Sequence, residues 1–465
     1  MTQFRSLYSA QIVGPAAAAR KLAHETVIAI ENDLLTHRLP IGASLGTLPQ
    51  LQKRFRLGLP ALRQAVAILE ARGLLEVRRG IKGGLYVSRP AIQDVARALL
   101  QFLALRHARV RCVQEARFIV LQVLVETLMD RRDPLPSPPV DSGSERFLVW
   151  LASLTTNEGL RFLAELIEEI YAHCRSSHLR SVPESNAPIT ATLERKLCAA
   201  ISAGNAIEAA ALASELCAVD RFPDPEAPIS LAAVMNLSFS LNRNKYAGRI
   251  AALLLDELAI CEDTGAPRWL GSEREISERY GFDTAIVRQA LRLLEDLDLI
   301  TAQRGRGGGV FGMPPSDSAL VRYIGTCLAA RNVTFKDNSA VASLLAIHAA
   351  GLAAQRGGSG NSAPPPSIAS HSELASRPPR MDQIAFDNLL LELSGNMILP
   401  VLVRGFALQA VATEDLEPRS AAPTTVMATI SHYNERLLNA IRHGEADRAL
   451  SLARSKDAIM KSLEA

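Results

Sequence analysis

Apolar residues recur at helical spacing along the N-terminal part of the chain, with polar residues on the opposite faces. This pattern predicts three helices, at residues 16–36, 48–55 and 60–72. Two short segments of alternating apolar and polar residues, 75–77 and 85–87, predict strands on either side of a basic, glycine-rich turn. Three helices followed by a β-hairpin predict a winged helix-turn-helix unit.

The same pattern recurs 225 positions later without a gap, so that residues 48–86 correspond to residues 273–311. Matching motifs connect the two copies: Arg63-Gln64-Ala65 with Arg288-Gln289-Ala290, and Arg79-Gly80 with Arg304-Gly305. We therefore predict two winged helix-turn-helix units, which we name the first head (residues 16–90) and the second head (residues 241–314).

Each head is followed by a region with helical patterning and a Pro/Ser-rich or Pro/Gly/Ser-rich interruption. A hydrophobic content of 48% with only 5% aromatic residues also favours packed helices. We expect a mainly α fold with small β wings, in which two winged helix-turn-helix domains alternate with two all-α bundles. The predicted parts are a tail at 1–15, the first head, a first body at 91–220, a linker at 221–240, the second head, and a second body at 315–465 with an insertion at 356–380.

The charge of the chain is distributed unevenly between the heads. Residues 45–90 hold nine Lys or Arg against two acids, whereas residues 271–313 hold six Arg against seven acids. A local excess of this size is the electrostatic footprint of a phosphate-binding surface. The first head is therefore predicted to be broadly basic, and any positive surface of the second head must be local.

Several function classes are excluded by what the sequence lacks. The six cysteines are scattered without a CxxC pair, which indicates reduced thiols in a cytoplasm and predicts no metal or disulfide framework. No GxSxG, HExxH or phosphate-loop motif is present, so an enzyme is not expected. The uncharged segment 338–355 is interpreted as a buried helix rather than a membrane span, and no cofactor is predicted.

The second head carries the clearest family motif, LGSEREISERYGFDTAIVRQALRLLEDLDLI followed by QRGRGGGVF. This segment resembles the winged helix-turn-helix of the GntR family of bacterial transcription regulators. The bodies resemble the FadR-type effector-binding (FCD) domain of that family, from Phe386, Ser394-Gly395-Asn396 and the segment LLNAIRHGEADRAL. The resemblance implies a regulator that binds double-stranded DNA through its heads and senses a small molecule in its bodies.

A recognition helix presents polar side chains to the major groove while its apolar face packs, and a glycine-rich wing approaches the phosphates. On this basis the candidate DNA-binding residues are Arg63, Gln64, Arg79, Gly80, Lys82, Arg274, Thr284, Arg288, Gln289, Arg304, Gly305 and Arg306. The alternative is that these are solvated helix faces and an ordinary hairpin.

The heads depart from the family pattern in different ways. Arg274 supplies an arginine that the family has in the helix before the turn, but Pro49 replaces it in the first head. A second family arginine is missing from both heads, because Leu59 and Thr284 take its place. The hypothesis is that the first head binds phosphate more than it recognises bases.

The metal site of many FadR-type bodies is not expected here. The family's four ligand positions correspond to Gln383, Asp387, Asn434 and Lys456 in the second body, and to Ser144, Leu148, Glu194 and Leu216 in the first. Neither set provides the usual ligands, and a lysine opposes a cation. The four polar residues of the second body are instead candidate contacts for a small polar or anionic effector.

We interpret the chain as a cytoplasmic transcription regulator, acting as a repressor, whose two fused units form an internal pseudo-dimer on an operator. Pairing of two such chains remains open. The alternative is a degenerate regulator that acts through protein interaction or heterodimerisation and binds DNA weakly. The loss of an arginine from both recognition helices favours that alternative, and the basic first head opposes it.

Overall fold

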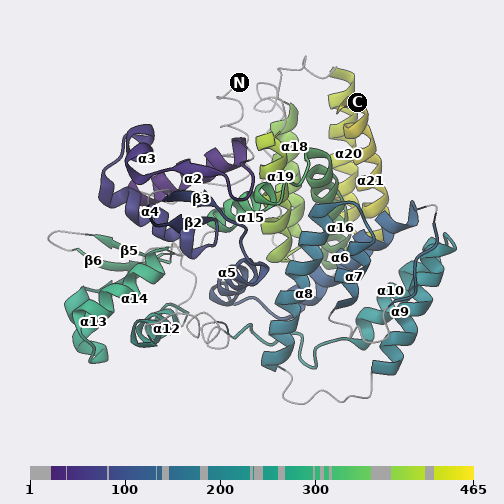
Figure 1. Ribbon diagram of the computed structural model, residues 1–465. Coiled ribbons are helices and arrows are strands. Elements are labelled where there is room, and N and C mark those ends of the chain that lie inside the picture. The colour runs from purple at the N-terminus through teal and green to yellow at the C-terminus, as the bar shows by residue number, and fades with distance from the viewer. Residues whose placement is uncertain are drawn as a thin grey trace.

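Two small sheet-bearing units and a larger set of helices make up the structure, a computed structural model in which most described residues are helical. Figure 1 shows the two units at the left and the helices of the bodies at the right. The predicted fold class is confirmed: mainly helical, with small antiparallel sheets. The described residues are 22–37, 39–80, 83–131, 133–138, 146–178, 187–230, 234, 245–259, 268–296, 299–303, 308–313, 317–357, 379–413 and 424–464.

The first head packs three helices on a three-stranded antiparallel sheet. Its elements are α2 (Leu22–His37), β1 (Ser44–Gly46), α3 (Leu48–Phe55), α4 (Leu59–Ala71), β2 (Leu75–Arg78) and β3 (Gly84–Val87), and the strand order is β1-β3-β2. The apolar face of α4 is buried, with Leu62 and Leu69 fully inaccessible. Gly73, at a φ of +69°, follows the last turn of α4 in the left-handed conformation that a helix C-terminus favours.

The second head has the same order of elements and the same strand pairing. These elements are α12 (Lys245–Ala259), β4 (Arg268–Gly271), α13 (Glu273–Tyr280), α14 (Thr284–Asp296), β5 (Ile300–Gln303) and β6 (Gly309–Gly312), with the order β4-β6-β5. Leu75 pairs with Val87 in the first sheet, and Ile300 pairs with Gly312 in the second. Each residue of the second pair thus lies 225 positions after its counterpart in the first pair, the same spacing that separates the two sequence motifs.

Each sheet contains a third strand that the sequence pattern does not predict. β1 and β4 are three and four residues long, and unlike the similarly short hairpin strands they do not flank a glycine-rich turn that marks them in the sequence. They form by pairing with the free edge of β3 or β6, and each pairing is irregular at its equivalent position. A strand specified by its partner's edge leaves little trace in its own sequence.

Six described helices follow each head. The first body contains α5 (Ile92–Leu105), α6 (Arg111–Met129), α7 (Phe147–Ser153), α8 (Glu158–His178), α9 (Ala187–Ser202) and α10 (Ala206–Val219). The second body contains α15 (Ser318–Ala330), α16 (Phe335–Gly357), α18 (Pro379–Leu393), α19 (Ile398–Thr413), α20 (Thr424–Arg442) and α21 (Ala446–Glu464). The uncharged segment 338–355 lies within α16, and none of the helices in the described ranges is long and apolar enough to cross a membrane.

The two bodies contact each other through equivalent groups. Asn157 donates from Nδ2 to the backbone oxygen of Asp337 at 3.4 Å, and Asn396 donates from Nδ2 to the backbone oxygen of Cys112 at 2.9 Å. Cys112 and Asp337 occupy equivalent places, 225 positions apart, in α6 and α16. The helix contacts are reciprocal as well, because α8 packs on α16 and α6 packs on α19. This is the contact pattern of an approximate two-fold axis.

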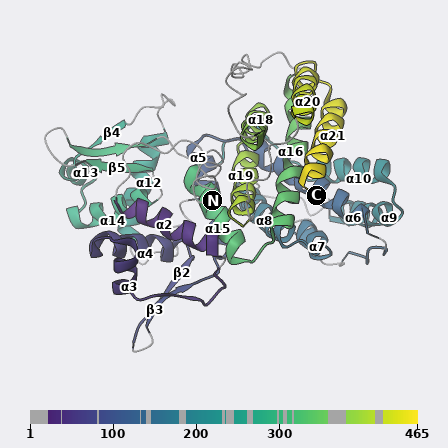
Figure 2. The same ribbon diagram turned by 90° about the horizontal axis from the view of Figure 1, so that it is seen from above.

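Each head is packed against the body of the other half of the chain. Helix α2 of the first head packs against α15 and α19, and α12 of the second head packs against α5. Seen from above, the heads lie next to each other at one side, and α2 extends from the first head toward α15 and α19 (Figure 2). The two halves are therefore interlocked rather than strung one after the other.

A buried ionic cluster connects the first head to the second body. Glu31 has no exposed side-chain surface, and it pairs with Arg72 at 2.9 Å and with Arg322 of α15 at 3.3 Å. The Tyr323 hydroxyl donates to the backbone oxygen of Arg72 at 2.6 Å. Removing one partner of a buried ion pair leaves an uncompensated charge, so this cluster holds the head firmly in place.

The first part of the predicted 221–240 linker is packed against the first body. The Val110 amide donates to the oxygen of Ala227, the Ile229 amide donates to the oxygen of Ala108, and the Phe222 side chain is buried. The prolines of this segment exclude a helix, as expected, but an extended segment still offers carbonyl groups and apolar side chains to its neighbours. Of the remaining linker residues, 231–233 and 235–240 lie outside the described ranges.

Glu31→Gln is expected to lower the free energy of unfolding by about 3 kcal/mol, because buried Arg322 and half-buried Arg72 lose their counter-charge. The matched control is Glu76→Gln, which removes a partner of Arg78 from an exposed pair and should leave the urea midpoint nearly unchanged. Urea denaturation followed by circular dichroism measures both variants. Equal midpoints for the two variants would contradict a stabilising role for the cluster.

Candidate functional site

The helix-turn-helix of the second head is defined by hydrogen bonds at its helix ends. Ser272 and Glu275 form a capping box at the start of α13, with the Ser272 amide donating to Glu275 Oε2 at 2.6 Å and the Glu275 amide donating to Ser272 Oγ at 3.2 Å. Gly281, at a φ of +68°, ends α13. The Asp283 side chain then accepts from the Ala285 amide at 2.7 Å, at the start of α14. These contacts fix the turn between the two helices.

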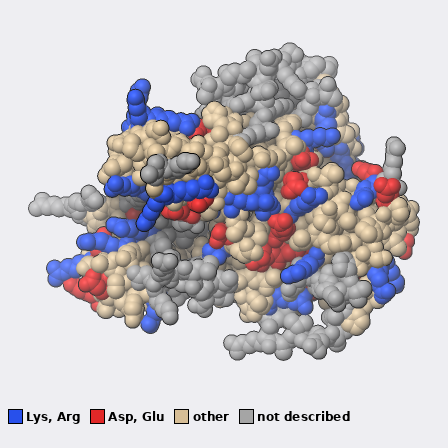
Figure 3. Space-filling view, in the orientation of Figure 1, with Lys and Arg blue, Asp and Glu red and all other residues tan. Residues whose placement is uncertain are grey.

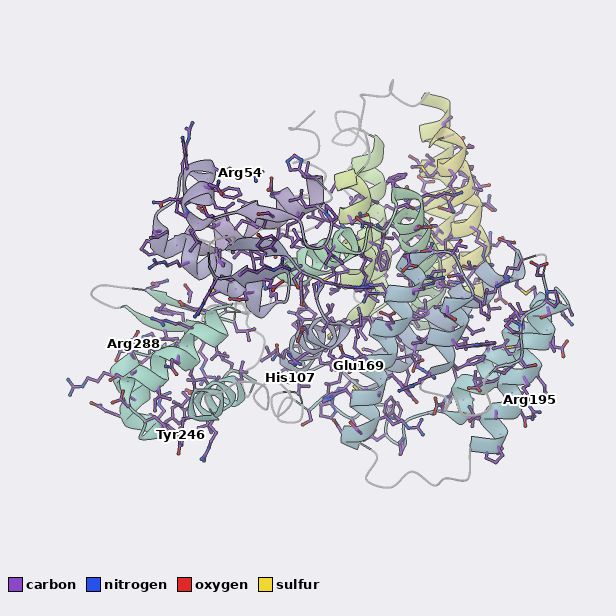
Figure 4. The ribbon with its side chains drawn as sticks, viewed as in Figure 1. Arg54, His107, Glu169, Arg195, Tyr246 and Arg288 are labelled. Atoms are coloured by element: carbon purple, nitrogen blue, oxygen red, sulfur yellow. The ribbon has the colours of Figure 1, made fainter. Side chains whose placement is uncertain are left out.

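Helix α14 separates a packed face from an exposed face, as a recognition helix requires. Its buried residues are Val287, Ala290, Leu291 and Leu294. Ala285, Arg288 and Gln289 are exposed and Thr284 is half-buried, so the structure places the three predicted contacts of this helix on its outward side. Figure 4 marks Arg288 on α14 of this head.

Two arginines of the second head are paired through their Nε atoms. Arg288 donates from Nε to Glu273 at 2.6 Å, and Arg274 donates from Nε to Glu278 at 2.7 Å. All four side chains are substantially exposed. The structure thus keeps both predicted arginines at the surface. It also adds two acids that the sequence analysis does not single out. The i, i+4 spacing would have revealed Glu278, but Glu273 lies 15 positions from Arg288 and gives no local signal.

A third arginine of this helix-turn-helix has a structural position. Arg279 pairs with Glu257 of α12 at 2.9 Å and also donates to the backbone oxygen of Leu270 at 3.0 Å. The Tyr280 hydroxyl donates to the same Glu257 at 2.9 Å. These contacts attach α13 to the helix beneath it, and this arginine is therefore not a candidate for DNA contact.

The first head presents a broad basic surface. Figure 3 shows Lys and Arg side chains gathered over the upper-left unit, whereas basic and acidic side chains are mixed on the lower-left one. Among the described residues of the first head, the exposed basic ones are Lys53, Arg54, Arg56, Arg63, Arg78, Arg79 and Arg89. Within the described part of the chain, Arg63 and Arg79 have no ion-pair partner, whereas Arg54 pairs with Asp33 at 2.5 Å.

The base of the first wing combines charge with glycine geometry. The Arg78 guanidinium lies 4.2 Å from the centre of the Tyr86 ring and pairs with Glu76 at 2.9 Å. Gly80 has a φ of +106°, and a Cβ on Gly83 would meet backbone oxygens at 2.7 Å. The turn therefore requires glycine at both positions. This geometry supports the predicted place of Arg79 and Gly80 in the wing.

Some predicted contacts cannot be placed. Lys82 of the first wing and Arg304, Gly305 and Arg306 of the second lie outside the described residues, as does the side chain of Gln64. Gly309 closes the described base of the second wing, where a Cβ would meet Trp269 Nε1 at 2.6 Å. The strands that carry the two wings are thus equivalent, and the second wing tip remains a prediction.

In the second body, three of the four residues predicted to contact an effector lie together. Asp387 Oδ1 accepts from Gln383 Nε2 at 2.6 Å and from Lys456 Nζ at 3.1 Å. The Lys456 ammonium also lies 4.3 Å from the centre of the Phe386 ring. Gln383 Oε1 and Asn434 Oδ1 are buried, and neither has a hydrogen-bond partner in the described part of the chain. We name these four residues the polar cluster.

The corresponding region of the first body is closed by internal charges. Leu148 and Leu216 are buried there, and Ser144 lies outside the described residues. The Arg117 guanidinium pairs with Glu168 and Asp220, each at 3.0 Å, and burial raises the pKa of nearby Glu194 to about 7. The buried guanidinium of Arg117 is therefore already paired with acids of the same body.

The comparisons with known proteins bear on the second head. Residues 268–310 match the family model described as "Bacterial regulatory proteins, gntR family". Among solved structures, the chain is similar to Streptococcus agalactiae GntR, with 19% identity over 43% of this chain and 98% of that chain, and a TM-score of 0.25. A superposition of that quality does not support a shared arrangement of domains.

No curated protein matches the chain. The matched segment 268–310 begins at β4, includes α13, α14 and β5, and ends inside β6. It therefore covers the helix-turn-helix and most of the sheet of the second head. The chain contains a gntR-family helix-turn-helix domain, the DNA-binding domain of a transcription regulator.

Proposed function

We propose that the protein is a transcription regulator, acting as a repressor, that binds one DNA operator through two unequal heads on one chain. The proposal rests on the match at residues 268–310 together with the exposure of Arg274 and Arg288 on that segment. The basic groups of this arrangement are exposed, so they can contact the phosphates of a duplex.

The recurrence of the same strand register supports a second DNA-binding head. The first head repeats the helix order and sheet pairing of the matched segment at a spacing of 225 positions, and it adds exposed basic residues. We infer that the chain is one head-plus-body unit present twice. The first head would bind mainly phosphates, because Pro49 and Leu59 stand where the family has arginines.

The reciprocal contacts of Asn157 and Asn396 support an internal pseudo-dimer. Ordinary regulators of this kind need two chains to match the two halves of an operator. Here both halves of the binding unit come from one chain, and their side chains differ. The preferred operator is therefore asymmetric.

We further propose that the second body senses a small polar or anionic effector through the polar cluster. Two buried oxygens without partners and a buried ammonium with one carboxylate partner favour a ligand that both donates and accepts hydrogen bonds. Helix α21 packs on α16, α16 on α19, and α19 on α2 of the first head. A ligand that shifts α21 would thus act on the position of that head.

DNA binding by the full chain should weaken at least about 100-fold between 50 and 200 mM salt, because phosphate contacts release counterions. The probe is a duplex from the region upstream of its own coding sequence, and fluorescence anisotropy measures the affinity. Arg79→Gln should lower the salt slope, whereas Arg195→Gln on distant α9 (Figure 4) should leave it unchanged. A wild-type chain that shows no salt-dependent binding would support the interaction-protein alternative instead.

Arg288→Gln should relax sequence preference by about 5-fold or more, since a bidentate arginine–guanine contact contributes discrimination of that order. Arg63 is the equivalent residue of the first head, and Arg63→Gln should weaken binding to all sequences about equally. Competition titrations with operator variants compare the two proteins. Equal loss of discrimination in both variants would reject the division of labour between the heads.

A panel of small carboxylates should contain a ligand that raises the melting temperature of the wild-type chain by about 5 °C when it is present at ~100 times its Kd. Lys456→Met keeps the length of the side chain and should abolish that shift. Lys461→Met on the same helix removes an exposed lysine and should keep it. The effector proposal fails if no carboxylate stabilises the wild type or if Lys456→Met retains the response.

A further inference from the structure

The two exposed arginines of the second head are each held by one particular nitrogen. Glu273 accepts the Nε–H of Arg288 at 2.6 Å, and Glu278 accepts the Nε–H of Arg274 at 2.7 Å. Among the described residues, no hydrogen bond uses the terminal Nη groups of either arginine. Each guanidinium is therefore held through its Nε atom, while its two Nη groups remain available for another partner.

The choice of nitrogen matters for base recognition. Guanine offers O6 and N7 in the major groove, and arginine binds this pair with two parallel N–H groups. When a carboxylate occupies Nε, the two Nη groups form the remaining fork, at the end of a side chain that is 57% exposed in Arg288. A free arginine loses rotamer entropy when it adopts this geometry, and an arginine that is already held loses less.

Fold stability explains these acids only in small part. The side chains of Arg288 and Glu273 are 57% and 41% exposed, and pairs this exposed contribute little to stability, as does an acid in the first turn of a helix such as α13. An acid beside a recognition helix also repels phosphate, so it lowers the general affinity for DNA. An acid at this position is unfavourable for binding DNA as such, but it favours an arginine held in one geometry.

The first head provides an internal comparison. Leu48 stands at the place of Glu273, and Lys53 stands at the place of Glu278, both 225 positions earlier. Arg63, the counterpart of Arg288, is exposed and has no ion-pair partner in the described part of the chain. The head that keeps more of the family's arginines is thus the head that holds them with carboxylates.

We propose that Glu273 is a positioning residue that presents the Nη fork of Arg288 to one guanine and makes the second head the sequence-selective one. Glu273 lowers the general affinity for DNA and raises the discrimination between bases. This inference rests on the proposed DNA-binding function, and it predicts two effects of opposite sign when the carboxylate is removed. A residue with only a structural or repulsive role would not separate these effects.

The experiment compares full-length wild type with Glu273→Leu, which introduces the first head's residue, and with Glu273→Gln, which keeps the shape of the side chain. Each protein selects sites from a library of random-sequence duplexes at one salt concentration. Affinities are then measured for the site selected by the wild type and for copies of it with single base changes. Arg288→Gln identifies the guanine that depends on Arg288. Glu278→Gln is the matched control, because it removes the same charge from the same helix without touching that arginine.

Glu273→Leu should raise affinity for random duplexes about 3-fold, as an acid leaves the interface. It should lower discrimination at the Arg288-dependent guanine about 5-fold or more, with Glu273→Gln between it and the wild type. Glu278→Gln should raise random-duplex affinity similarly and leave discrimination at that guanine unchanged.

The inference is overturned if Glu273→Leu and Glu273→Gln keep discrimination at that guanine, or if Glu278→Gln lowers it equally. It is also overturned if Arg288→Gln alters no position, because no base then depends on that arginine. A wild-type chain that selects no site and binds no duplex would instead reject the proposed function itself. The two failures are therefore distinguishable.

Discussion

Glu31 is a carboxylate with no exposed side-chain surface, and its two arginine partners come from parts of the chain far apart in sequence. Arg72 belongs to the same head, whereas Arg322 lies 291 positions away on α15. A buried charge without a partner is strongly unfavourable, so the pair with Arg322 fixes the position of the first head against the second body. The crossed contacts of α2 and α12 with the opposite bodies then make the two halves one interlocked unit.

The buried cluster around Glu31 constrains the first head more than the second. At the equivalent sequence positions, Leu297 replaces Arg72 and Ala98 replaces Tyr323. Arg97, the counterpart of Arg322, pairs with Asp94 on its own helix at 2.9 Å. The broadly basic head is thus anchored by a buried cluster whose Arg72 and Tyr323 have no similar residue at the equivalent positions of the chain. The proposed division of labour therefore places anchorage and phosphate binding in the first head and discrimination between sequences in the second.

Much of the fold follows from sequence periodicity, because α4 and α14 have strong apolar faces and their ends carry proline, glycine or capping residues. The outward side of α14 was predictable for the same reason. Strands β1 and β4 were not, since they do not flank the glycine-rich turns that mark the similarly short hairpin strands. Neither Glu31–Arg322 nor Glu273–Arg288 was predictable, because tertiary structure brings together residues that have no local spacing in common. The polar cluster was located by resemblance, but its pairing of Asp387 with Lys456 required coordinates.

The central claim is that one chain supplies both halves of an operator-binding unit. The most direct test is the mass of the DNA complex, measured by sedimentation on a duplex that carries a single selected operator. One chain should bind each duplex, and changes in either head should remove the contacts that this head makes with its half of the site. A complex that requires two chains per operator, or one in which only the second head protects DNA, would contradict it.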